Sequence, residues 1–118
     1  MDKQNNIQKY ICEKVDIIQS SPIDMFPADL IIISNAYSCN TAFIKCKVSN
    51  ETIECVPVFR TVLDAIKFVG ECLSPNINIK LDETTFENAR LVAKQKPETV
   101  KCLALFEDNR VKMVHYIR

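Results

Sequence analysis

The sequence predicts an α+β domain with one mixed, mostly antiparallel sheet and three helices packed mainly on one face of it. Two segments alternate apolar and polar residues around a central turn, which is typical of β-hairpins. Three other segments repeat apolar residues every three or four positions, as amphipathic helices do. The chain has 118 residues, the size of one domain, and no repeat or Gly/Ser linker divides it. Residues 1–118 are therefore expected to form a single globular unit.

The first helix is predicted over residues 3–19. Its apolar side chains recur at intervals of four, four and three, and they form one stripe: Ile7, Ile11, Val15 and Ile18. Pro22 ends this helix, because proline has no N–H to donate and disfavours helix in the residue before it. Residues 30–34 follow as a short run rich in β-branched residues, which indicates a strand buried on both faces.

A hairpin is predicted over residues 42–58, with its turn centred between Asn50 and Glu51. In this register the apolar residues share one face, and Lys47 lies opposite Glu54. A single register that sorts apolar residues and also pairs opposite charges is what a real hairpin shows.

The second helix is predicted over residues 61–73 and is expected to be the most buried of the three. Its apolar positions cover much of its circumference: Val62, Leu63, Ala65, Ile66, Phe68, Val69, Cys72 and Leu73. Gly70 lies within it and costs about 1 kcal/mol of helix stability relative to alanine. Close packing against a neighbouring element would explain a glycine there.

A short strand over residues 76–82 and a third helix reaching about residue 95 come next. Thr84 and Glu87 have the spacing of a capping box, in which each side chain accepts a hydrogen bond from the other residue's backbone N–H.

The last predicted element is a second hairpin, with strands over residues 99–106 and 111–117. Asp108 and Asn109 form its turn, because both residue types tolerate a left-handed backbone. Both faces of this hairpin are apolar. It is therefore expected either to lie centrally between two layers or to have one face covered by a partner.

Composition excludes several functional classes. The chain contains one glycine, whereas phosphate-binding loops, dinucleotide fingerprints and nucleophile elbows need two or three. No cofactor is therefore expected. Fifteen basic residues balance fifteen acidic ones, which is a poor footprint for nucleic acid. The nearest approach to a basic patch is formed by Lys94, Lys96, Lys101, Arg110, Lys112 and Arg118.

The six cysteines are expected to be reduced and to act as small core hydrophobes. The N-terminus lacks the apolar core of a signal peptide, and no apolar run approaches the length of a membrane span. We therefore expect a cytoplasmic location, in the protein's own cell or in a host, where thiols stay reduced. No C-x-x-C spacing occurs, so no metal site is predicted. The hairpin register places Cys46 opposite Cys55, which leaves a cross-strand disulfide or half of a zinc site as alternatives to two buried thiols.

The register of the second hairpin places Cys102 opposite His115. A thiol beside an imidazole is the core of a cysteine nucleophile, because the imidazole can take the thiol proton. The alternative, which the apolar neighbours favour, is that both side chains are buried in the core. A register slip of one residue would place them on opposite faces.

The functional expectation is a non-enzymatic module that binds another protein, as an inhibitor, an immunity-type neutraliser, an adaptor or a viral or phage antagonist. A thiol-dependent enzyme and a nucleic-acid-associated regulatory subunit are the alternatives, and self-association through the C-terminal hairpin is a further one. Aromatic and Met side chains dominate interface energies. The expected contact residues lie in two loops and on the reverse face of that hairpin: Met25, Phe26, Tyr37, Leu103, Val114 and Tyr116.

Overall fold

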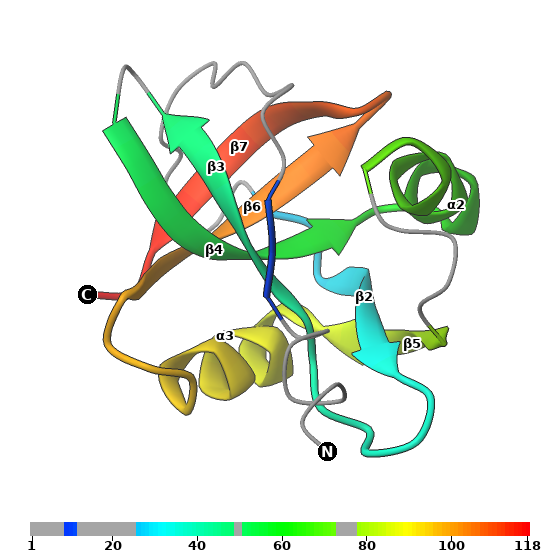
Figure 1. The fold of residues 1–118 in the computed structure, drawn as a ribbon, viewed down its shortest axis with the longest axis horizontal. Helices are drawn as coiled ribbons and strands as arrows, with labels where there is room; N and C mark the ends of the chain where they lie inside the picture. Colours follow the sequence, from blue (N-terminus) through cyan, green and yellow to red (C-terminus); the bar gives the residue numbers. More distant parts are fainter. Residues whose placement is uncertain (1–8, 12–25, 49–50, 73–77) are drawn as a thin grey trace.

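The computed structural model describes residues 9–11, 26–48, 51–72 and 78–118. These residues form one mixed seven-stranded sheet and two helices (Figure 1), which confirms the α+β class. The strands are β1 (Lys9–Ile11), β2 (Asp29–Asn35), β3 (Phe43–Val48), β4 (Glu51–Phe59), β5 (Ile79–Thr85), β6 (Val100–Glu107) and β7 (Arg110–Tyr116). The helices are α2 (Val62–Cys72) and α3 (Phe86–Lys94).

The predicted first helix is wrong where it can be compared with the structure. Lys9–Ile11 is a strand that runs parallel to β3, with Tyr10 beside Ile44. The other residues of the predicted helix lie outside the described part of the chain. A periodic apolar pattern is a weak local preference, and here the backbone hydrogen bonds offered by the edge of β3 outweigh it.

Strand β4 lies at the centre of the sheet. Its first half pairs antiparallel with β3, its last two residues pair antiparallel with β2, and its other edge carries β6 in parallel. β2 in turn pairs with β5 along its whole length. Residues 54–59 of β4 and residues 102–106 of β6 are all buried, so both faces of these two strands need cover.

The two helices supply that cover from opposite sides, which corrects the prediction that the helices share one face. α2 packs Ala65 and Phe68 against one face of the sheet, and α3 packs Ala89 and Ala93 against the other. Figure 1 shows α2 and α3 on opposite sides of the strands. The physical reason is that β4 and β6 are apolar on both faces, so one helical layer would leave the other face in water.

The first hairpin forms as predicted, but its register differs by two residues. Glu54 faces Lys45 rather than Lys47, and Cys55 faces Ile44 rather than Cys46. A shift of two residues leaves every side chain on its own face of the sheet, because side chains alternate with a period of two. The apolar pattern is therefore the same in both registers and could not distinguish them.

The second hairpin has the predicted turn and an additional irregularity. Asp108 and Asn109 have φ of 56° and 63°, the left-handed backbone that the prediction required. Phe106 faces Val111 in the predicted register. A β-bulge between Leu105 and Phe106 then shifts the rest of the strand pair by one residue.

Helix α3 begins one residue later than the capping box implied. Thr85 is the N-cap, and its Oγ1 accepts a hydrogen bond from the backbone N–H of Asn88 at 3.1 Å. Thr84 Oγ1 accepts instead from the Asn88 side-chain amide at 2.8 Å. At the other end, the Arg118 guanidinium donates to carbonyl oxygens at and just beyond the last turn, including those of Ala93 and Lys96.

Candidate functional site

Three of the expected contact residues are buried in the structure. Leu103 and Val114 are 0% and 1% exposed, and Phe26 is buried beside Phe86 of α3. The reverse face of the C-terminal hairpin is covered within the chain, so the hairpin is central rather than open to a partner. This corrects the expectation that these three side chains form a surface.

Of the other three expected contact residues, two are exposed and one lies outside the described residues. Tyr37 is 71% exposed in the loop between β2 and β3, where its hydroxyl accepts a hydrogen bond from the Asn78 side-chain amide at 3.3 Å. Tyr116 is 46% exposed on β7, which pairs only with β6 among the described strands. Met25 lies outside the described residues.

The predicted Cys102–His115 pair is not formed. Because of the β-bulge, Cys102 faces Tyr116, and His115 faces Leu103. Cys102 belongs to the buried cluster under α2, whereas the His115 ring lies on the α3 side, with its centroid 5.1 Å from that of Phe86. A base on the opposite face of the sheet cannot take the thiol proton.

The surroundings of His115 disfavour the charged form of its ring. Burial lowers its pKa from the ordinary value, and the positive charges of Arg90 and Lys94 lower it further. Its Nε2 atom is buried and has no hydrogen-bond partner among the residues that the structure describes. These features describe a half-buried ring packed between aromatic side chains.

The structure describes the side chains of Cys39, Cys55 and Cys102. Cys55 and Cys102 are fully buried neighbours on the parallel strands β4 and β6, a pairing that the sequence did not indicate. Cys39 is exposed, and its Sγ accepts a hydrogen bond from Lys80 Nζ at 3.3 Å, which raises the pKa of Lys80. Among the described residues no three His, Cys, Asp or Glu side chains are grouped to hold a metal.

Two members of the weak basic patch have internal roles. Arg118 binds backbone carbonyl oxygens after α3, including that of Val100 at 2.8 Å. Lys96 lies over the ring of Phe43, with Nζ 5.9 Å from its centroid, and burial lowers the pKa of this amine. Side chains used in this way are less available to neutralise phosphates.

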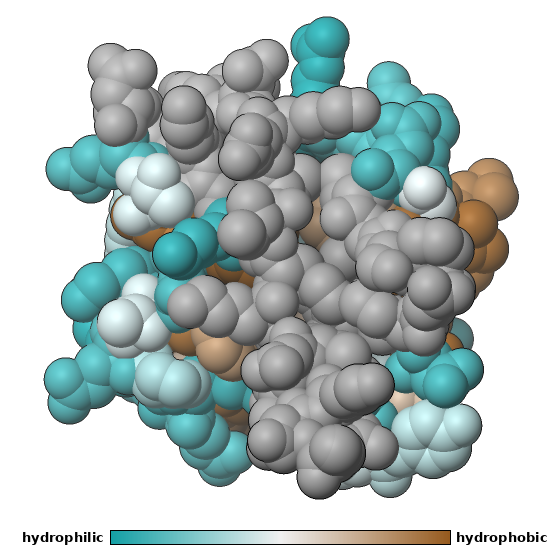
Figure 2. Space-filling view, viewed as in Figure 1, coloured by the Kyte–Doolittle hydropathy of each residue, from teal (hydrophilic) through white to brown (hydrophobic). Residues whose placement is uncertain are grey.

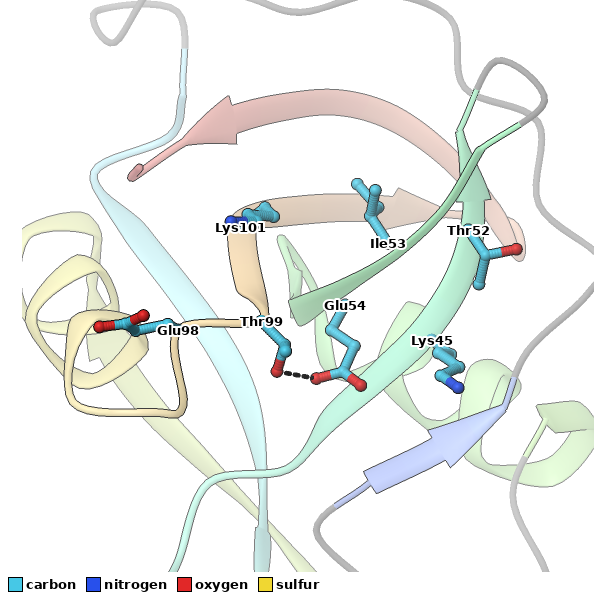
Figure 3. A pocket seen from close by; sticks show the side chains of 7 residues that line it. All are labelled: Lys45, Thr52, Ile53, Glu54, Glu98, Thr99 and Lys101. Atoms are coloured by element: carbon cyan, nitrogen blue, oxygen red, sulfur yellow. Dashed lines mark hydrogen bonds between the residues drawn. The ribbon is translucent and has the colours of Figure 1, made fainter.

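A groove of about 440 Å³ lies beside the first residues of β4 and β6 (Figure 3). At its floor Thr99 Oγ1 donates a 2.6 Å hydrogen bond to the buried carboxylate of Glu54. Side chains of both charges line it: Lys45, Thr52, Ile53, Glu54, Glu98, Thr99 and Lys101. Because two lysines and two glutamates line it, the groove favours neither a strongly acidic nor a strongly basic ligand.

Three exposed aliphatic side chains lie together on α2, which corrects the expectation that this helix is the most buried. Leu63 is 77% exposed, Ile66 54% and Val62 46%. The helix turns about 100° per residue, so these side chains and the exposed Gly70 share an arc of about 100°. We name Val62, Leu63, Ile66 and Gly70 the α2 outer face. Figure 2 shows hydrophobic atoms protruding where Figure 1 places α2.

Two sets of contacts fix the position of α2. Thr61 Oγ1 accepts a hydrogen bond from the Asp64 backbone N–H at 3.1 Å and so caps the first turn. Asp64 Oδ1 accepts from the backbone N–H of Asp108 at 3.1 Å, and Lys67 forms an ion pair with the Asp108 carboxylate. On the inner side, the Phe68 ring packs 4.8 Å from that of Phe106. The α2 outer face is therefore presented by a helix that is anchored at both its capped end and its inner side.

Comparison of the chain with protein-family models, with curated proteins and with solved structures finds no match. Among the described residues no helix has the length and apolar character needed to cross a membrane.

Proposed function

We propose that this protein is a non-enzymatic binding module that docks on another protein through the α2 outer face. The observation that carries the proposal is the exposure of three large aliphatic side chains on one helix. Moving such a side chain from water into an apolar contact contributes up to about 1.5–3 kcal/mol. Single apolar residues scattered over a surface are normal, whereas a contiguous exposed apolar patch is often a functional contact surface.

The shape of this face indicates how it would bind. Leu63 and Ile66 stand at positions i and i+3, and Val62 and Ile66 at positions i and i+4, of a helix that packs its other side against the sheet. Helices that dock into an apolar groove use anchors with this spacing. The partner is therefore proposed to offer a groove or a flat apolar face, and this protein supplies the convex element.

Because α2 is already fixed in place, the small apolar patch on it can bind a partner with little entropic cost. The Thr61 cap and the Asp64–Asp108 contact hold the helix before a partner arrives. A binding element that is already ordered loses little conformational entropy on association. Inhibitors, neutralisers of toxins and adaptors all depend on contact of this kind, and the proposal covers that class.

The enzymatic alternative depended on Cys102 and His115 lying side by side, and they do not. A thiol-dependent reaction through Cys102 needs a base within hydrogen-bond reach, and His115 lies across the sheet. The nucleic-acid alternative is weakened by the internal roles of Lys96 and Arg118. Neither alternative is supported by a specific group of side chains in the described residues.

A pair of matched charge variants tests the proposal. Leu63 on α2 and Leu91 on α3 are both more than half exposed, so glutamate at either position should leave the fold intact. Each tagged variant is purified from the cells that make the protein, and the co-purifying proteins are quantified. We expect a protein that accompanies the wild type and Leu91→Glu to be lost from Leu63→Glu. Equal recovery with all three would reject docking through this face.

A further inference from the structure

We draw no further inference here: the strongest candidate, the apolar α2 outer face around Leu63 and Ile66, belongs to the surface already proposed for docking, and nothing in the described residues shows what covers it.

Discussion

At the scale of single residues, His115 links burial to pH-dependent stability. Its pKa is lowered in the folded protein, chiefly by burial, so the unfolded chain binds a proton more readily. The contribution of the neutral ring to stability is fully present above the unfolded pKa of about 6.5, and it is lost as the pH falls through the folded pKa.

We therefore expect the urea midpoint of the wild type to fall between about pH 7.5 and about pH 5.5. His115→Gln removes the titrating group, so its midpoint should fall less over the same interval. Equal losses for the two proteins would show that His115 does not carry this dependence.

The cysteines differ sharply in access to solvent. Cys39 is exposed, whereas Cys55 and Cys102 are fully buried between the sheet and α2. Iodoacetamide is expected to alkylate Cys39 in the native protein and to reach Cys55 and Cys102 only after unfolding, as followed by peptide mass spectrometry. Rapid native modification of Cys102 would restore the thiol-enzyme hypothesis.

Residue pairs across strands were the least predictable feature of the site. The sequence pattern distinguishes the faces of a strand but not registers that differ by two residues, so Cys46 was assigned to Cys55 instead of Ile53. In the second hairpin the turn was predicted correctly, but the apolar residues on both sides gave no sign of the bulge between Leu105 and Phe106. That bulge is what separates Cys102 from His115.

At the scale of elements, the start of α3 shows the limit of a capping motif. Both Thr84 and Thr85 precede the helix, and only the structure identifies Thr85 as the residue whose hydroxyl accepts from a backbone N–H. The Thr84 hydroxyl accepts from a side chain, and such a contact satisfies none of the unpaired donors of the first turn.

Thr85→Ala is therefore expected to lower the free energy of unfolding by about 1 kcal/mol, and Thr84→Ala by clearly less. Urea denaturation of the two variants at one pH gives the comparison. A larger loss for Thr84→Ala would support the capping box that the sequence spacing suggested.

Helix α2 was predicted with nearly correct bounds, yet its exposure was predicted wrongly. Apolar residues cover most of its circumference, and a helix can press only one side against a sheet. Ala65 and Phe68 take the inner side, which leaves Leu63 and Ile66 in water. Local periodicity identifies which residues share a face, but not how many faces the rest of the chain can cover.

At the scale of the whole molecule, the order of elements was predictable from β2 onward and their arrangement was not. The parallel pairing of β4 with β6 joins residues more than forty positions apart, and no local pattern encodes it. That pairing places two strands with apolar residues on both faces at the centre and requires a helix on each side. The exposed arc of α2 follows from this arrangement, because α2 lies alone on its side among the described helices.

Site-specific photo-crosslinking tests the central claim most directly. A photoreactive side chain is placed at position 63 or, as a control, at position 91, and the cells that make the protein are irradiated. We predict a discrete cross-linked protein from position 63 that disappears when Ile66→Glu is added, and none from position 91. Cross-linking of the same protein from both positions, or from position 63 regardless of Ile66→Glu, would contradict docking through the α2 outer face.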